Sequence, residues 1–258
     1  MKTKKRILIY CIAVICGLII MVGKTNISGN VYGKYFMNTV QTDEDIEEVL
    51  TVEDIDGNTY RIVQIGEQWW FAENLRTTRY ANGESILLVT DKKEWVKLTE
   101  GAWCWYDNNS NHDNTHGKLY NWYAVGDSRN ICPEGWHVPT DEEWYMLENF
   151  VDPTIDDPNA INWRGADAAS KLKAPDVLFT GGSRGVRATN QYGFSAHISG
   201  YRHHHGIFLN IEGTGMWWTS TEYTKDFAWY RMMYYDLSNI RRITDNKKLG
   251  YSVRCIKD

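Results

Sequence analysis

The pattern of hydrophobic and polar positions divides the chain into three parts. An unbroken apolar run extends from Ile7 to Gly23. Residues 24–50 show no sustained period and end in the acidic stretch TDEDIEEVL, which is typical of a linker or stalk. From Thr51, short runs rich in Trp, Tyr, Val and Ile alternate with clusters of Gly, Asn and Asp, as expected for strands joined by turns and loops. We therefore predict one folded domain over residues 51–258.

A tight hairpin opens the predicted domain. In the stretch TVEDIDGNTYRIVQI, the pair Asp56-Gly57 separates two β-prone runs. This pair supplies the positive-φ residues that a short hairpin turn requires. We expect the first strand of the domain to begin at Thr51.

Two helices are predicted in the middle of the domain. Thr140 and Glu143 form the pattern of a capping box, and Pro153 ends the helix that they begin. The apolar positions of this helix follow at three- and four-residue spacing: Trp144, Leu147 and Val151. A second, short helix is expected over residues 165–172, before Pro175. Few helices among many short strands indicate an α+β domain.

The N-terminal segment has the pattern of an export signal. Four basic residues precede the apolar run: Lys2, Lys4, Lys5 and Arg6. The run reaches the lower limit of a membrane span, about 17 to 25 residues, and Met21 and Gly23 fit the small-residue rule of signal peptidase poorly. Residues 1–23 are therefore predicted to be either a cleaved signal peptide or a signal anchor through residues 7–23. In both cases we expect an exported protein, periplasmic, on the cell surface or extracellular.

The charge balance argues against nucleic acid as a partner. Four of the 28 basic residues lie in the export segment, which leaves 24 basic against 33 acidic residues and a net charge near −9. A nucleic-acid-binding protein needs a concentrated positive surface that releases counterions, and no basic run occurs after the N-terminus. The twelve Trp and sixteen Tyr instead indicate that rings with a polar edge supply much of the burial and can also face ligands.

Three cysteines remain in the predicted domain: Cys104, Cys132 and Cys255. An odd number in an exported protein favours one disulfide and one free thiol, and no spacing indicates zinc. A Cys132–Cys255 bond would close a loop of about 120 residues and remove about 5 kcal/mol of unfolded-chain entropy, more than a Cys104–Cys132 bond. This argument favours the first pairing and leaves the others open.

Several segments, taken in order, resemble one family. They include IDGNTYRIVQIGEQWWFAENLRTTRY, CWYDNN, GKLYNWYAV, ICPEGWHVPTDEEW, NQYGFSA, WWTSTE and GYSVRC. Their order over residues 51–258 is similar to that of the Fibrobacter succinogenes major paralogous domain, a family of exported bacterial proteins. The segments VPTDEEW and SVRC are also distantly similar to the formylglycine-generating enzyme superfamily, which has a C-type-lectin-like fold.

The resemblance implies an architecture for the α+β domain. A twisted antiparallel sheet should carry the N- and C-terminal strands together, with two helices packed alongside and long irregular loops. Trp136 and Trp144 are then core residues. The family also implies a disulfide between Cys132, near the first helix, and Cys255, on the last strand.

No set of residues for catalysis is found. Oxidases of the related superfamily use a reactive cysteine pair near the C-terminus, whereas Cys255 matches a structural cysteine and has no second cysteine near it. Cys104 lies between two Trp and is expected to be buried. No nucleophile, phosphate-binding or metalloprotease motif occurs at a convincing place. We therefore predict a protein without enzymatic activity and without a cofactor.

Three segments invite a metal or sugar interpretation, and none fits a known site. The consecutive residues His203, His204 and His205 cannot all converge on one ion from a strand, since alternate side chains point to opposite faces, although a loop could bring two together. The loop 107–117 is rich in oxygen donors but departs from the EF-hand pattern. Residues 157–159 resemble half of a lectin sugar motif. We assign no metal to these segments.

The ligand-binding surface is predicted within residues 227–248, before the closing strand. Strand alternation divides FAWYRMMYYD into two faces. We expect one face to point outward, together with two residues of the return strand: Tyr230, Met232, Tyr234, Asp236, Asn239 and Arg241. Rings beside planar hydrogen-bonding groups would suit a sugar or a protein epitope. The alternative is an aromatic sheet face that loops merely cover.

These predictions describe an exported, non-enzymatic binding module that recognises a glycan or a protein. A structural cell-surface protein without a dedicated ligand and a divergent enzyme of the formylglycine-generating superfamily are the alternatives. Contact with a membrane is expected only through the N-terminal segment, if it is not cleaved.

Overall fold

The computed structural model describes residues 14–15, 18–19, 49–175 and 187–258. The chain divides into two units, Met1–Ile46 and Glu47–Asp258. In the first unit, the described residues form two short antiparallel strands, β1 (Val14–Ile15) and β2 (Leu18–Ile19). The rest of the predicted export segment and nearly all of the predicted linker lie outside the described residues. Within the described ranges, no helix is long and apolar enough to span a bilayer.

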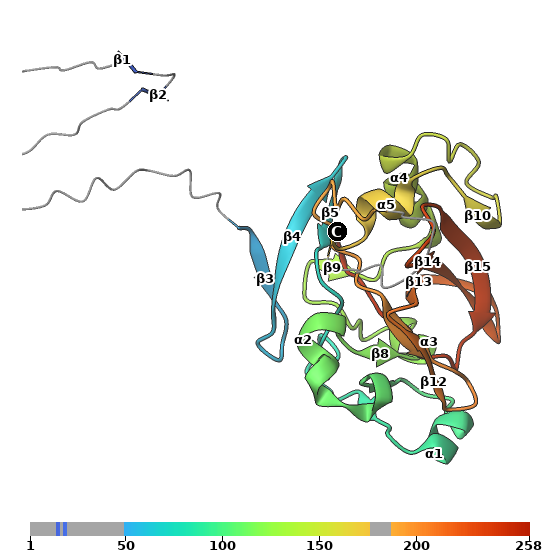
Figure 1. The fold of residues 1–258 in the computed structure, drawn as a ribbon. Helices are drawn as coiled ribbons and strands as arrows, with labels where there is room; N and C mark the ends of the chain where they lie inside the picture. Colours follow the sequence, from blue (N-terminus) through green and yellow to red (C-terminus); the bar gives the residue numbers. More distant parts are fainter. Residues whose placement is uncertain (1–13, 16–17, 20–48, 176–186) are drawn as a thin grey trace, which may run out of the picture. The chain divides into compact units, whose positions relative to one another are not determined.

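The second unit is a mixed α+β domain built mostly from antiparallel strands (Figure 1). Its largest sheet has five strands in the order β3-β4-β5-β16-β9. The bounds are β3 (Thr51–Glu53), β4 (Thr59–Ile65), β5 (Gln68–Phe71), β16 (Ile256–Lys257) and β9 (Trp136–His137). The first and last strands of the domain therefore share one sheet, as the resemblance implies. The predicted hairpin joins β3 to β4, and Gly57 has the positive φ of 80° that its turn requires.

A second sheet has four antiparallel strands in the order β10-β15-β14-β13. The bounds are β10 (Asn162–Arg164), β15 (Ile240–Asn246), β14 (Phe227–Tyr234) and β13 (Thr214–Thr224). Two smaller sheets complete the described strands. One pairs β11 (Ser199–Arg202) with β12 (Phe208–Ile211), and the other joins β6 (Leu87–Leu88), β7 (Ala102–Cys104) and β8 (Leu119–Tyr120).

The capping box of the main helix, α4 (Asp141–Val151), is confirmed. The hydroxyl of Thr140 accepts the amide of Glu143 at 3.1 Å, and the Glu143 carboxylate accepts the amide of Thr140 at 2.7 Å. The second helix, α5 (Ala168–Leu172), is shorter than predicted, because Gly165 has a φ of +77°, outside the helical region. The described residues also contain three short α-helices and two 3₁₀ turns, more than the two helices that the resemblance implies: α1 (Lys92–Lys97), α2 (Asp113–His116), α3 (Trp122–Val125), η1 (Tyr106–Asn108) and η2 (Ser110–His112).

The four-stranded sheet lies between two parts of the core. On one face, Trp144 and Leu147 of α4 pack with Trp217 and Met233, and α5 joins the same cluster. Trp136 is buried in the other, larger cluster, so both predicted core tryptophans are confirmed. Full burial of one such side chain stabilises the fold by about 1.5–3 kcal/mol. This double cover determines which residues of the sheet can reach a ligand.

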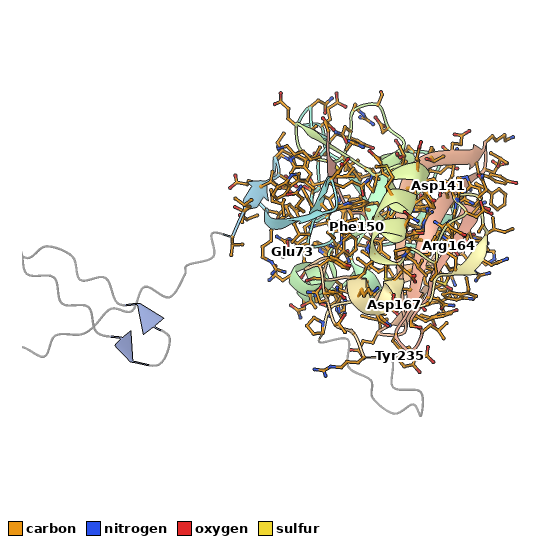
Figure 2. The ribbon with its side chains drawn as sticks, turned by 90° about the horizontal axis from the view of Figure 1, so that it is seen from above. Glu73, Asp141, Phe150, Arg164, Asp167 and Tyr235 are labelled. Carbon is orange, nitrogen blue, oxygen red and sulfur yellow. A yellow bond between two sulfur atoms is a disulfide. The ribbon has the colours of Figure 1, made fainter. Side chains whose placement is uncertain are left out.

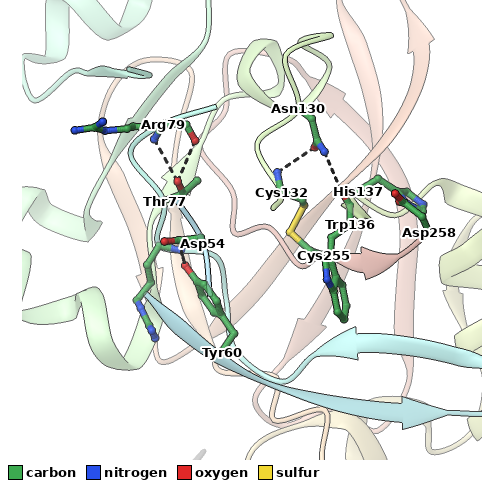
Figure 3. The surroundings of a disulfide bond; sticks show 11 residues. Asp54, Tyr60, Thr77, Arg79, Asn130, Cys132, Trp136, His137, Cys255 and Asp258 are labelled. Carbon is green, nitrogen blue, oxygen red and sulfur yellow. Dashed lines mark hydrogen bonds and ion pairs between the residues drawn. A yellow bond between two sulfur atoms is a disulfide. The ribbon is translucent and has the colours of Figure 1, made fainter. Parts of the chain in front are cut away.

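Cys132 and Cys255 form a disulfide, as predicted, with their Cα atoms 5.9 Å apart (Figure 3). Asn130 orders the segment before β9: its side chain accepts the amide of Cys132 at 3.0 Å and donates to the carbonyl of Trp136 at 2.8 Å. The bond ties this segment to the last strand. Cys104 is a buried free thiol, and burial raises its pKa to about 12, which makes the reactive thiolate scarce.

Candidate functional site

β14, the centre of the predicted binding surface, is buried on both faces. Tyr230 and Met232 are each only 4% exposed. The prediction that their face points to solvent is therefore wrong for these two residues. An antiparallel sheet often leaves one face in water. Here helices cover one face of β14, and Trp218 and Tyr251 pack on Tyr230 over the other.

The face of β14 that carries Arg231 packs against α4 through buried ion pairs. Arg231 donates to the carboxylates of Glu148 and Asp141, and Glu148 also pairs with Arg164. Figure 2 shows Asp141 and Arg164 on the side of α4 that faces the red strands. Burial alone would raise the pKa of Asp141, but hydrogen bonds from Arg242 and the charge of Arg231 hold this pKa below its usual value. The charged groups of this face form ion pairs with one another, which indicates a structural role.

The opposite face becomes accessible toward β15 and β10. Trp163 on β10 stands opposite Arg241 on β15, which stands opposite Met232 on β14. The ring centroid of Trp163 lies 5.3 Å from that of Tyr234, with 33° between the planes. The guanidinium carbon of Arg241 lies 5.6 Å from the Trp163 ring centroid. Two rings and one cation thus converge from three strands.

These side chains define a half-buried area that we call the Trp163 surface, and its members are Trp163, Tyr234, Asn239 and Arg241. Its polar atoms are only partly paired. The Nη2 atom of Arg241 donates to the Asn162 side chain at 3.1 Å. The Nε atom of Arg241 and the Oδ1 atom of Asn239 are buried and have no hydrogen-bond partner among the residues that the structure describes. Buried polar atoms are usually paired, so these two atoms leave unmet hydrogen bonds beside the half-buried rings.

The remaining predicted residue, Asp236, is half-buried in the turn between β14 and β15. Tyr201 on β11 is half-buried, with its ring centroid 6.0 Å from that of Tyr251, and its pKa is raised first by burial and then by the charges of Asp245 and Tyr234. Of the six predicted residues, the structure therefore keeps Tyr234, Asp236, Asn239 and Arg241 accessible, and it places Tyr230 and Met232 in the core.

The family model of the Fibrobacter succinogenes major domain matches residues 63–257. The chain belongs to this family. No curated protein and no solved structure matches the chain. The match covers the disulfide, the four-stranded sheet and the whole Trp163 surface, so these are parts of the Fibrobacter succinogenes major domain.

The sequence does not identify Trp163 as part of this surface. β10 has three residues, which is too short for an alternating pattern to show. The available signal is a single Trp between polar residues in a loop-rich segment of the Fibrobacter succinogenes major domain. Only the folded sheet places Trp163 opposite Arg241, and this register makes Trp163 part of the surface.

A second aromatic cluster lies on the other face of the sheet, near the start of α4. The Tyr223 and Trp229 rings are 5.2 Å apart, and the guanidinium carbon of Arg242 lies 3.7 Å from the Trp229 ring centroid. Tyr223 is 58% exposed. Arg242 is already paired with Asp141, so this cluster offers a ligand fewer free polar groups than the Trp163 surface.

The three consecutive histidines lie in the turn between β11 and β12, not in a strand. Strand alternation therefore does not apply here, and the loop brings together all three imidazoles, one more than expected of it, with one ligand nitrogen from each within 4.8 Å of the others.

Carboxylates of the other two candidate segments serve local structure. In loop 107–117, the Asp113 carboxylate accepts the indole N–H of Trp105 at 3.0 Å and pairs with Lys118 at 2.7 Å. In segment 157–159, the Asp157 side chain accepts the amide of Asn159 at 2.8 Å, which makes an Asx turn.

Proposed function

We propose that this chain is an exported, non-enzymatic binding module that recognises a glycan through the Trp163 surface. The observation that carries the proposal is the approach of Trp163, Tyr234 and Arg241 in one half-buried area. Aromatic rings supply apolar faces on which a sugar ring can stack, and a planar guanidinium supplies donors in a fixed geometry for hydroxyl or carboxylate groups. A protein epitope is the second class of ligand that the same groups would suit.

We further propose a C-type-lectin-like fold for the domain. A sheet that joins β16 to β5 and β9, two helices packed on a second sheet, and long loops support this assignment. Export is supported by the basic and apolar N-terminal sequence and by the Cys132–Cys255 bond, since disulfides persist mainly in oxidising compartments.

A glycan array with the full exported chain tests the ligand class. For any glycan that binds, Trp163→Ala and Arg241→Ala should each weaken affinity by about tenfold or more, the size expected for residues that dominate an interface. Tyr223→Ala is the matched control, because it removes a more exposed aromatic ring on the other face of the sheet. Melting temperatures report whether each variant is folded.

Three outcomes reject the proposal in part or whole. An array without binding rejects the glycan class and leaves a protein ligand. Equal loss of affinity in Tyr223→Ala and Trp163→Ala rejects the location. Turnover of a bound glycan by the wild-type chain rejects a non-enzymatic role.

A further inference from the structure

The turn between β11 and β12 presents three imidazole side chains in one place. The ring centroids of His203 and His204 are 4.0 Å apart, those of His204 and His205 are 4.2 Å apart, and those of His203 and His205 are 4.9 Å apart. One ligand nitrogen of each ring lies within 4.8 Å of the other two. His203 and His204 are half-buried and His205 is exposed, so a solute can reach the cluster from one side.

The folded domain holds this turn in place. The amide of His203 donates to the carbonyl of Ile207 and the amide of Gly206 donates to the carbonyl of His203, both at 2.7 Å. Gly206 has a φ of +75°, and a Cβ atom there would lie 2.6 Å from the carbonyl oxygen of Lys92. The preceding residue, Arg202, is buried and exchanges two backbone hydrogen bonds with Gly250, at 2.9 and 2.8 Å. The backbone that carries the imidazoles is thus held by contacts with distant parts of the chain.

Two Nδ1 atoms of the cluster differ in their hydrogen bonding. The Nδ1 atom of His203 accepts the backbone N–H of His205 at 3.2 Å, so it carries no proton, and its lone pair can bind an ion only when this long hydrogen bond is given up. The Nδ1 atom of His204 is buried and has no hydrogen-bond partner within the described part of the chain. Neutral imidazole is the form that binds metal ions.

We propose that His203, His204 and His205 form a binding site for a divalent transition-metal ion, with Zn²⁺ as the expected occupant. Imidazole ligands suit zinc, copper and nickel, and they disfavour magnesium and calcium. Zinc lies about 2.0–2.1 Å from each histidine nitrogen, which requires about 3.4 Å between nitrogens in a tetrahedral site. The three rings therefore need to close by a little over 1 Å from the 4.8 Å limit, a change that side-chain rotation can supply.

A negative group lies near the cluster. The Asp245 carboxylate interacts electrostatically with both half-buried histidines. It accepts the Tyr251 hydroxyl at 2.9 Å, which holds it in place. Three protein ligands leave one position of a tetrahedral ion for water or for an outside ligand. This site goes beyond the proposed glycan binding and does not depend on it.

Titration of the chelator-treated full chain with ZnCl₂, followed by NMR of the imidazole nitrogens, tests the site. We expect one equivalent of zinc to shift the ring resonances of His203, His204 and His205 and to leave those of His112, His116, His137 and His197 unchanged. CaCl₂ and MgCl₂ should shift none of them. Shifts confined to His112 and His116, whose ring centroids are 5.3 Å apart, would overturn the proposal.

Calorimetry separates a folded site from a flexible histidine tract. His204→Gln should lower zinc affinity by about 100-fold or more, because loss of an outer-sphere partner alone costs about 10–100-fold. His112→Gln should leave the affinity unchanged. The folded chain should bind zinc about tenfold or more tightly than the free peptide YRHHHGIF, because pre-organised ligands lose less conformational freedom on binding. Equal affinity of peptide and chain, or full affinity in His204→Gln, would show that the turn is not a built site.

Discussion

Glu148 of α4 and Arg231 of β14 form an ion pair in which neither side chain is exposed to solvent. Arg164 pairs with the second oxygen of the same carboxylate. Two guanidinium groups therefore share one carboxylate in the core, and Arg231 also pairs with Asp141. Desolvation of charges is costly, so a pair of this kind is stable only while each charge keeps its partners.

Glu148→Ala should lower the free energy of unfolding by about 3–5 kcal/mol, because Arg164 and Arg231 would remain buried without this counterion. Glu148→Gln should cost less, since the amide oxygen can still accept one hydrogen bond. Urea unfolding of purified protein measures both. Glu142→Ala, an exposed position on the same helix, is the control and should change stability by about 0.5 kcal/mol or less. Similar losses at positions 142 and 148 would contradict the buried network.

The cysteine pairing predicts which thiols can react with a labelling reagent. Under native conditions, no cysteine among residues 49–175 and 187–258 should react with iodoacetamide, since Cys104 is buried and its pKa is raised to about 12. In denaturant without reductant, Cys104 should become labelled while Cys132 and Cys255 remain joined. Mass spectrometry of the peptides reports each state. A Cys104-containing disulfide peptide is the result that the structure forbids.

Removal of the disulfide should destabilise the domain strongly. Its two cysteines are separated by 123 residues, and the loop model assigns about 4–5 kcal/mol to a closure of that length. The double variant Cys132→Ala with Cys255→Ala should therefore unfold at a much lower urea concentration than the oxidised chain. Cys104→Ala is the control, and it should cost only the effect of a small cavity. A double variant as stable as the control would contradict this prediction.

His137 should make the domain less stable as the pH becomes alkaline. Its ring nitrogens contact Glu143 at 2.9 Å and Asp258 at 2.6 Å, and these carboxylates raise its pKa to about 9 against the effect of burial. The folded-state pKa lies above the unfolded value of about 6.5. The stabilisation that protonated His137 gives the fold is therefore complete below about pH 6.5 and is lost as the pH rises through about 9. Because the His137 side chain is 34% exposed and solvent screens its ion pairs, we expect them to contribute about 1 kcal/mol to the free energy of unfolding.

His137→Gln should accordingly destabilise the domain at about pH 6 and have little effect at about pH 10. Urea unfolding at both pH values gives the difference between variant and wild type, in which other titrating groups cancel. His112→Gln serves as the control for removal of a histidine elsewhere. A destabilisation that is equal at the two pH values would assign His137 a packing role instead of an electrostatic one.

The unit boundary predicts how far the chain can be shortened. Residues 47–258 should melt in one cooperative transition, because this unit contains both large sheets and the disulfide. Residues 51–258 should also fold but should be less stable by about 0.5–1.5 kcal/mol, since the amide of Ile62 loses its acceptor, the carbonyl of Leu50, at 2.9 Å. Calorimetry of both fragments checks this. A broad, non-cooperative transition for residues 47–258 would place essential contacts earlier in the chain.

Local signals in the sequence were sufficient for elements whose causes are local. The hairpin at Gly57 and the helix start at Thr140 each depend on residues within a few positions, and both are found. The disulfide required the family resemblance as well, because loop entropy alone left other pairings open. The sheet that joins the first and last strands likewise followed from the resemblance.

The accessible face of β14 could not be read from its alternation. That pattern divides the strand into two faces, but the cover on each face comes from distant segments, α4 on one side and Tyr251 on the other. The approach of all three histidines could not be predicted for a related reason. Strand geometry does not apply to residues 203–205, and the turn that replaces it depends on Gly206 fitting against Lys92, far away in the sequence.

The position of β16 has a consequence for when the domain can fold. β16 (Ile256–Lys257) lies between β5 and β9, so the five-stranded sheet consists of two separate pieces until residue 257 has emerged from the ribosome or from a translocation channel. Until then, one edge of β5 and one edge of β9 have unpaired backbone groups, which are open to chaperones and to wrong partners. Cys132 must also wait for Cys255 as its partner. Closure of this sheet therefore waits until β16 has left the ribosome or the channel.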